Sequence, residues 1–307
     1  MGTSKKHKII GLSCGRKDGN NEILLKEALM AAGEMGVESE IIRAMDLRVK
    51  PCKGCESCTM AMGLGKVPEC VIKDDNVAWI LDKVCVEDYA LIVSVPTYHL
   101  RANGYFEIIN ERMLPVLMRY PDIVKKTRVG AIISAAGGRP EWTPLTLVST
   151  NIFVQHTRKL VDQFQFNCPT SRPGSVLTSE KYMQRARLLG QRVAQAMSMP
   201  IDQVKYMGED KDFSCPVCHC DVVKVPDALP EVYCPVCWVR GELYMDNGKM
   251  KIKWNPDDVR NPRFSERELA HHFEYIKNSQ IKFFTQDAEN VKKMLPKYVS
   301  YGTVIRP

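Results

Sequence analysis

The sequence predicts an α/β protein in which a doubly wound parallel sheet precedes a small cysteine-rich module. Three observations lead to this prediction. Apolar runs of strand length alternate with helical patterns over the first two hundred residues or so. Two CPVC repeats follow, starting at Cys215 and Cys234. The end of the chain is charged and contains one helical pattern. We therefore expect three parts, over residues 1–200, 201–256 and 257–307.

Five runs of apolar residues predict the strands. The run YALIVSVP is continuously apolar, as expected for a strand covered on both faces, whereas VESEIIRA alternates. Helical spacing of apolar residues separates these runs, and Asn76 is a possible N-cap of the second helix. The strands are expected over 6–13, 37–44, 89–96, 128–135 and 161–167, and the helices over 23–32, 76–88, 103–118, 142–160 and 180–197. Five strands and five helices within this length match the size of a flavodoxin-like domain.

The remaining segments give weaker signals. Asp246, Asn247 and Gly248 predict the turn of a hairpin within the second part. A helical pattern over 265–277 predicts the helix of the third part.

Composition is that of an ordinary soluble globular protein, with 45% hydrophobic and 26% charged residues among 307. No apolar run approaches the roughly 18 residues that span a bilayer, and the N-terminus lacks the apolar segment of a signal peptide. We therefore expect a cytoplasmic protein with no membrane partner. The net charge of +7 is spread along the chain. It favours acidic partners or phosphorylated cofactors in general and is weak evidence for nucleic acid.

The loops after the first, third and fourth strands are SCGRKDGNN, PTYHLRANG and AAGGRP. Loops at the carboxyl ends of parallel strands meet at one edge of the sheet, where ligands bind. The first loop opens a helix, whose N-terminus attracts phosphate, and it carries Arg16. Tyr98 in the second loop can lie against a planar ring, and the small residues of the third allow close approach. The three loops together indicate one ligand with a phosphate and a flat ring.

These three loops resemble the flavin-binding loops of the NADPH-dependent FMN reductase family, and the likeness covers about residues 7–198. With the cysteine loop described next, the resemblance narrows to the iron–sulfur flavoproteins of that family. It implies bound FMN, a flavin-dependent oxidoreductase activity and a flavodoxin-like fold. The residues that it implies around the FMN phosphate are Ser13, Arg16, Gly19, Asn20 and Asn21. Those implied along the flavin ring and its borders are Pro96, Thr97, Tyr98, Gly104, Ala135, Ala136, Gly137 and Gly138.

Four of the twelve cysteines lie in one loop after the second strand, in a C-x2-C-x2-C-x11-C array. Disulfides are disfavoured in a chain without a secretion signal, and clustered thiols favour a metal. The short spacing suits an iron–sulfur cluster better than zinc, and free thiols remain a third alternative. The resemblance implies a 4Fe-4S cluster beside the flavin. The expected ligands are Cys52, Cys55, Cys58 and Cys70, with Cys70 preferred to Cys85 as the fourth.

Two C-x2-C knuckles form the second cysteine group. Cys215 and Cys218 are separated by fifteen residues from Cys234 and Cys237, a spacing typical of structural zinc. A single rubredoxin-like iron in the same tetrahedron is the alternative. His219 and Cys220 adjoin the first knuckle, and we expect them to be spare residues at the surface.

Three functions follow as hypotheses. The first is an oxidoreductase or electron-transfer protein that uses FMN and a nearby 4Fe-4S cluster. Its donor would be NAD(P)H or a ferredoxin-like protein, its acceptor is unknown, and the family implies a homo-oligomer. The second is an NAD(P)H-dependent FMN or quinone reductase without a cluster. The third is a zinc-ribbon adaptor or nucleic-acid-binding module on a flavodoxin scaffold.

Overall fold

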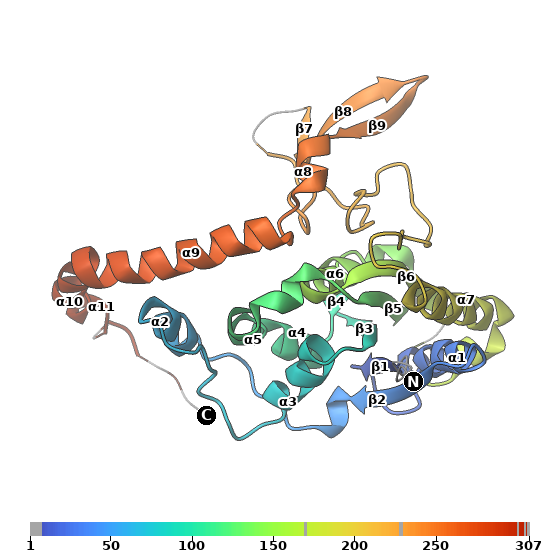
Figure 1. Cartoon of the computed structure of the whole chain (residues 1–307), viewed down its shortest axis with the longest axis horizontal. Coiled ribbons are helices and arrows are strands. Elements are labelled where there is room, and N and C mark those ends of the chain that lie inside the picture. Colours follow the sequence, from blue (N-terminus) through green and yellow to red (C-terminus); the bar gives the residue numbers. More distant parts are fainter. Residues whose placement is uncertain (1–7, 169–170, 227–229, 300, 304, 306–307) are drawn as a thin grey trace, which may run out of the picture.

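A computed structural model describes residues 8–168, 171–226, 230–299, 301–303 and 305. Five parallel strands form its main sheet in the order β2-β1-β3-β5-β6, and this order confirms the predicted flavodoxin-like fold (Figure 1). Lys6 and His7, which we expected in the first strand, lie outside the described residues. The strands are β1 (Lys8–Ser13), β2 (Glu38–Arg43), β3 (Ala90–Tyr98), β5 (Val129–Gly137) and β6 (Lys159–Cys168).

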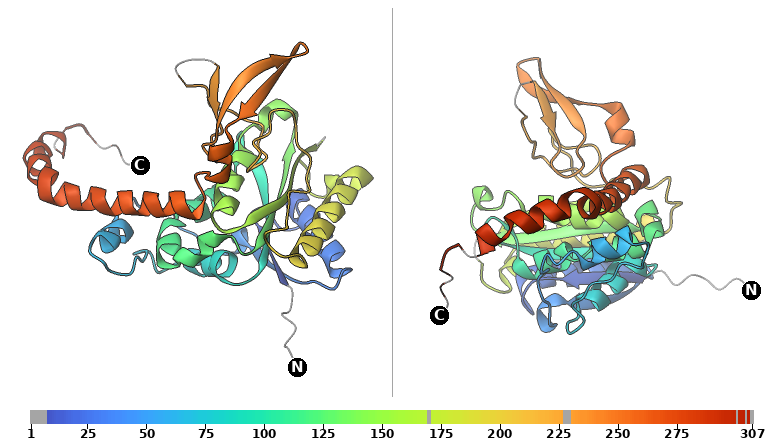
Figure 2. Two further views of the ribbon diagram at one scale, coloured as in Figure 1. Left: turned by 45° about the horizontal axis from the view of Figure 1, so that its top comes forward. Right: turned by 90° about the vertical axis from the view of Figure 1, so that its left-hand side faces the viewer.

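Helices cover both faces of this sheet (Figures 1 and 2). On one face α1 (Asn20–Gly33) packs beside α7 (Glu180–Met197), and both bury apolar side chains against the strands. The two helices approach closely at Gly190, where an added Cβ would lie 1.9 Å from the Ala28 carbonyl oxygen. A side chain at position 190 would therefore separate them.

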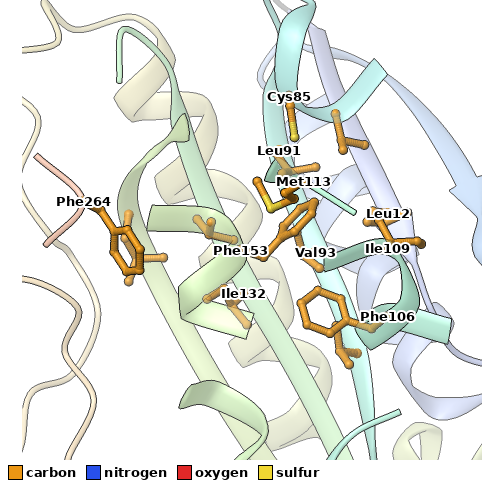
Figure 3. Packing of buried hydrophobic residues seen from close by; sticks show 14 of the residues in the cluster. Leu12, Cys85, Leu91, Val93, Phe106, Ile109, Met113, Ile132, Phe153 and Phe264 are labelled. Atoms are coloured by element: carbon orange, nitrogen blue, oxygen red, sulfur yellow. The ribbon is translucent and has the colours of Figure 1, made fainter. Parts of the chain in front are cut away.

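The opposite face carries the larger core, part of which Figure 3 shows. Phe106 and Phe153 meet there edge to face, with ring centroids 5.5 Å apart. The elements on this face are α3 (Val77–Leu81), η2 (Asp82–Val86), α4 (Gly104–Glu111), α5 (Leu114–Arg119) and α6 (Thr146–Thr157).

The cysteine-rich module forms a separate antiparallel sheet of β7 (Glu231–Tyr233), β8 (Arg240–Asp246) and β9 (Lys249–Trp254). The predicted hairpin turn is present, with positive φ angles of 50° at Asn247 and 77° at Gly248. The chain then continues into one short helix that lies against the module and into further helices that extend away from it (Figure 1). These are α8 (Pro256–Arg260), α9 (Glu266–Lys282), η6 (Phe283–Asp287), α10 (Ala288–Met294) and α11 (Pro296–Val299).

Several element boundaries differ from the prediction. The helix expected over 103–118 is divided into α4 and α5 near Arg112, because Pro115 can enter only the first turn of a new helix. The helix expected from residue 142 begins at Thr146. A two-residue strand, β4 (Arg101–Ala102), pairs antiparallel with β3 and was not predicted. The tail contains further helical segments beyond the one expected.

Candidate functional site

A cleft of about 750 Å³ lies at the carboxyl edge of the sheet, where the loops after β1, β3 and β5 meet. Eleven of the thirteen residues predicted around the flavin line it. The two exceptions are Ser13, buried at the end of β1, and Gly104, which begins α4. The lining residues from the prediction are Arg16, Gly19, Asn20, Asn21, Pro96, Thr97, Tyr98, Ala135, Ala136, Gly137 and Gly138.

One end of the cleft is suited to an anion. Gly19 is the N-cap of α1 and provides no side-chain cap, so the first-turn amides keep their hydrogen-bonding capacity. The exposed Arg16 guanidinium donates to the Ser171 carbonyl oxygen. The Ser13 hydroxyl, at the end of β1, is buried and has no hydrogen-bond partner among the described residues. A cation and free amides thus lie at one end of the site.

The first turn of α1 also contains a buried acid, Glu22. Burial alone would raise the pKa of Glu22, but hydrogen bonds from Arg43 and Lys26 lower it overall. The Arg43 Nε lies 3.0 and 3.1 Å from the two carboxylate oxygens. These two cations compensate a negative charge that would otherwise oppose an anion at this helix end.

Two asparagine side chains hold the loops together. The Asn21 amide bonds the backbone of Ala135, which joins the first loop to the third. Asn103 donates to the Cys14 carbonyl oxygen at 2.6 Å and accepts from the Phe106 amide, so it joins the first loop to the second. These bonds use the amide groups internally and fix the shape of the cleft.

Sequence reasoning did not select every lining residue. Gly15 and Ser171 also line the cleft, as does His99, which the sequence places in the second loop as a residue that could guide a substrate or a proton. Ser171 follows β6, whose carboxyl end lies at the same edge, so the argument used for the other strands would have found it. Asn103 was missed as well, although an Asn before Gly104 is a recognisable helix cap.

The four-cysteine loop leaves the same sheet edge after β2, but none of the described residues lining the cleft belongs to it. Cys52 and Cys55 are exposed, while Cys58 and Cys70 are partly buried. Burial raises the pKa of Cys58, and negative charge on Cys52 and Cys70 raises it further. Among the described residues, no three of these four cysteines have sulfur atoms within 4.8 Å of one another. A hydrogen bond from Ser57 lowers the pKa of Cys55.

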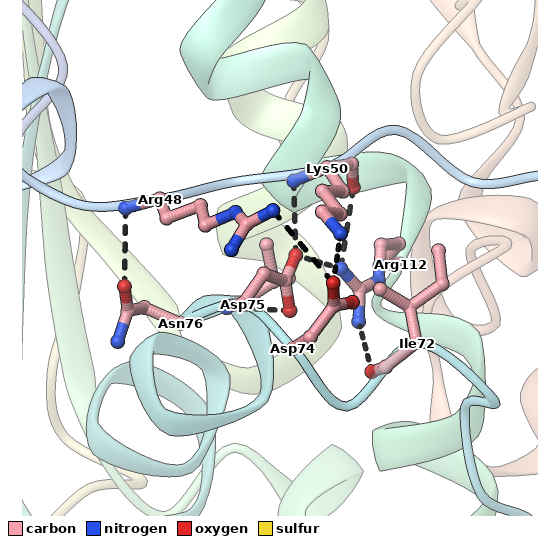
Figure 4. Close-up of polar contacts among 8 residues, drawn as sticks. Arg48, Lys50, Ile72, Asp74, Asp75, Asn76 and Arg112 are labelled. Atoms are coloured by element: carbon pink, nitrogen blue, oxygen red, sulfur yellow. Dashed lines mark hydrogen bonds and ion pairs between the residues drawn. The ribbon is translucent and has the colours of Figure 1, made fainter.

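A buried ion pair closes the base of this loop (Figure 4). Arg112 pairs with Asp75, and both side chains are almost completely buried. Arg112 also donates to the carbonyl oxygens of Lys50 at 3.2 Å and Ile72 at 3.1 Å. Asp75 accepts from the Lys50 amide at 2.9 Å. One arginine therefore holds both ends of the segment that carries all four cysteines.

The second cysteine group forms a compact buried site. The sulfur atoms of Cys215, Cys218, Cys234 and Cys237 all lie within 4.8 Å of one another. Those of Cys218 and Cys234 are 3.5 Å apart. Sulfur atoms at the corners of a zinc tetrahedron are separated by about 3.8 Å, so the site matches a four-thiolate metal.

The two knuckles of this site have the same backbone geometry. His219 donates from its amide to the Cys215 carbonyl oxygen at 2.8 Å, and Trp238 donates to Cys234 at 2.9 Å. His219 and Trp238 have nearly equal positive φ angles of 58° and 59°. The chain thus turns around the four sulfur atoms twice in the same way.

Neither His219 nor Cys220 belongs to the group of four sulfur atoms, but the prediction that Cys220 lies at the surface was wrong. The His219 ring stacks on Tyr206 with centroids 3.5 Å apart, and Cys220 is 3% exposed. Asn151 donates to the Cys220 sulfur at 3.3 Å, and Gln163 donates to the Cys218 carbonyl oxygen at 3.0 Å. The first knuckle packs against α6 and β6, which buries Cys220, whereas His219 is partly buried against Tyr206.

Residues 7–171 match the family model described as NADPH-dependent FMN reductase. The chain belongs to the NADPH-dependent FMN reductase family. It is 28% identical over 203 residues to an iron–sulfur flavoprotein of Methanocaldococcus jannaschii. The matched residues make up 62% of this chain and 98% of that protein. An iron–sulfur flavoprotein of Methanosarcina thermophila is 32% identical over 133 residues, 43% of this chain and 64% of that one.

A solved structure described as a flavone reductase has the same fold over nearly the whole chain, with a TM-score of 0.76. It is 23% identical and covers 98% of this chain and 99% of that one. As a member of its family, this FMN reductase homologue is a flavin-dependent oxidoreductase, and its relatives include the iron–sulfur flavoproteins. No helix within the described ranges has the length and apolar character needed to cross a membrane.

Proposed function

We propose that the protein is an iron–sulfur flavoprotein that binds FMN in the carboxyl-edge cleft and a 4Fe-4S cluster in the loop 52–70. The observation that supports this most strongly is the convergence of three loops on one cleft beside Arg16. In this proposal Arg16, the amides after Gly19 and the Ser13 hydroxyl hold the phosphate. Asn21 shapes the cleft through Ala135.

The flavin ring would lie between the second and third loops. Tyr98 is 49% exposed and lines the cleft, so its ring can cover the flavin. Thr97 is held in place by the Thr146 hydroxyl at 2.6 Å. Gly138 has a φ of +101°, which a glycine adopts without strain, and its backbone can approach the ring closely.

Cys52, Cys55, Cys58 and Cys70 are proposed as the cluster ligands. Their all-thiol character suits iron–sulfur clusters, and two exposed sulfur atoms leave access for assembly. When both cofactors are bound, flavin accepts a hydride and releases single electrons, and a cluster carries one electron at a time. NAD(P)H is the donor proposed from the family, and a ferredoxin-like protein is the alternative.

For the second cysteine group we propose structural zinc. Its four buried thiolates leave no position for a substrate, which is typical of structural sites. A single iron in the same tetrahedron is the alternative. We also propose a homo-oligomer in the cytoplasm, as is common among proteins of this family.

The test compares wild-type protein with a Cys52→Ser/Cys55→Ser variant under anaerobic conditions. NADPH should reduce the flavin at similar rates in both proteins, because neither cysteine lines the cleft. Transfer to a one-electron acceptor should fall at least tenfold in the variant if the cluster carries the electrons. Equal transfer rates would contradict the proposed role of the loop.

One observation favours a second function. Since no described cleft residue comes from the cysteine loop, the cleft is able to serve as a two-electron reductase by itself. An NAD(P)H-dependent FMN or quinone reductase without a cluster would show equal activity in both proteins of this comparison.

A further inference from the structure

The helix that carries Cys58 depends on distant residues for its position. This helix, α2 (Ser57–Gly63), has seven residues, and none of them is buried although all are described. Its N-cap, Glu56, has a left-handed backbone with a φ of 57° and provides no side-chain cap. Isolated helices this short are unstable in water, so tertiary contacts must hold α2 in place.

The C-terminal helix α9 supplies such contacts, and it lies directly over α2 (Figures 1 and 2). The Gln280 amide nitrogen lies 3.5 Å from the Glu56 carboxylate and 3.4 Å from the Thr59 hydroxyl. At the end of α2, a Cβ added to Gly63 would lie 3.2 Å from the Gln280 Cβ. The two helices therefore approach closely where residue 63 has no side chain.

The other end of α9 is anchored on the second cysteine group. Just before the helix, the Arg263 amide donates to the Cys237 carbonyl oxygen at 2.8 Å. Phe264 and Leu269 are buried in the same cluster as the four cysteines of that group. The N-terminal end of α9 is thus fixed on the cysteine-rich module, and its C-terminal end contacts α2.

We infer that α9 is a brace that positions the loop 52–70, with Gln280 and Gly63 as the positioning contact. The base of the loop is closed by Arg112, and α9 holds its tip. The brace lies outside residues 7–171, the part that matches the family model. Its effect on the cluster rests on the proposed function, whereas its effect on the loop does not.

The test uses the full-length protein as purified under anaerobic conditions and three variants. Gly63→Leu places a side chain in the contact, and Gly63→Ala adds only the Cβ. Ser279→Leu also introduces a leucine, at an exposed position beside Gln280, and is the control. Leucine favours helix more than glycine does, so lost helix propensity cannot explain a weaker α2 in Gly63→Leu.

Two measurements distinguish the effect of α9 on the loop from its effect on the cluster. Trypsin cleavage after Lys66, which follows α2, should be about 5- to 30-fold faster in Gly63→Leu, intermediate in Gly63→Ala and unchanged in Ser279→Leu. The paramagnetic signal of the reduced cluster should shift or broaden in Gly63→Leu while FMN content stays at the wild-type level.

An unchanged cleavage rate in Gly63→Leu would contradict the inference that α9 positions the loop. If the wild-type protein contains no iron in this loop but cleavage still accelerates in Gly63→Leu, the brace is supported and the proposed cluster fails. Faster cleavage together with an unaltered cluster signal would show that α9 stabilises α2 without positioning the ligands, and it would contradict the inference.

Discussion

The side chain of Asn21 and the backbone of Ala135, both of which line the cleft, form a reciprocal pair of hydrogen bonds. The Asn21 Nδ2 donates to the Ala135 carbonyl oxygen at 3.0 Å, and the Ala135 amide donates to Oδ1 at 2.9 Å. Both groups are buried. The pair joins the loop after β1 to the carboxyl end of β5, so it sets the width of the site where we propose that FMN binds.

We predict that Asn21→Leu weakens FMN binding about 5- to 150-fold. The substitution leaves a buried donor and acceptor of Ala135 without partners, which costs about 1–3 kcal/mol and lets the loops separate. Fluorescence titration of the apoprotein with FMN measures the change. Asn278→Leu, at an exposed position on α9, is the control. Equal affinity in the wild-type and Asn21→Leu proteins would contradict this role.

Arg16→Ala should reduce affinity for FMN while leaving affinity for riboflavin, which lacks the phosphate, nearly unchanged. Hydrogen bonds to charged groups contribute about 1.5–3 kcal/mol, so we expect about a 10- to 150-fold loss for FMN. The neighbouring exposed Lys17→Ala is the matched control. Equal losses for both ligands would place Arg16 away from the phosphate.

Cys70 is the proposed fourth ligand of the cluster, whereas Cys85 is a cysteine of the hydrophobic core. Cys85 is fully buried in η2 beneath the sheet, whereas Cys70 belongs to the loop and is partly buried. We predict that Cys70→Ala converts the cluster to a three-iron form or loses it, with FMN retained. Cys85→Ala should keep the four-iron signal. Paramagnetic resonance of both reduced variants measures this, and the reverse pattern would refute the assignment.

Cys234→Ser should lose the metal of the second cysteine group but keep FMN. Metal binding to such modules is coupled to folding and contributes about 10–16 kcal/mol. We therefore expect faster proteolysis within residues 201–256. Cys220→Ser is the control, because Cys220 is buried beside the site but lies outside the group of four sulfur atoms. Full metal content in Cys234→Ser would exclude a four-cysteine site.

His156 should make stability depend on pH. Burial lowers the pKa of His156 from 6.5 to about 4, and its Nδ1 lies 2.6 Å from the Ile152 carbonyl oxygen. Below pH 6.5 the unfolded chain binds a proton that the folded protein does not accept until about pH 4. The free energy of unfolding therefore falls across this interval as the pH decreases.

Denaturant melts at several pH values measure this effect. The fall in stability should be smaller in His156→Gln than in the wild-type protein, and unchanged in the exposed variant His271→Gln. Identical pH profiles for His156→Gln and wild type would show that the buried imidazole does not cause the dependence.

The sequence was sufficient for the centre of the parallel sheet because the central strands are apolar runs that can be recognised from the local sequence. Burial of almost all of β3 and β5 confirms this. The carboxyl-edge rule then located most of the cleft, since it follows from topology alone. Ser171 was missed only because the rule was not applied to the last strand.

Long-range contacts could not be predicted in the same way. The anchoring of the cysteine loop by Arg112 joins residues that are 62 positions apart, and the contact of Gln280 with Glu56 joins residues 224 apart. No periodic pattern marks such pairs. Burial of Cys220 likewise depends on how the module packs on α6, and the stacking of His219 on Tyr206 on how the module folds back, which their local sequence does not determine.

The most direct test of the central proposal is a cofactor count after anaerobic purification. Flavin, iron, acid-labile sulfide and zinc are measured per chain in one preparation, together with the visible spectrum. The proposal predicts one FMN, about four iron and four sulfide, one zinc, and a broad brown absorption beneath the flavin bands. Stoichiometric flavin without sulfide would contradict it and leave a flavin reductase whose cysteine loop holds no cluster.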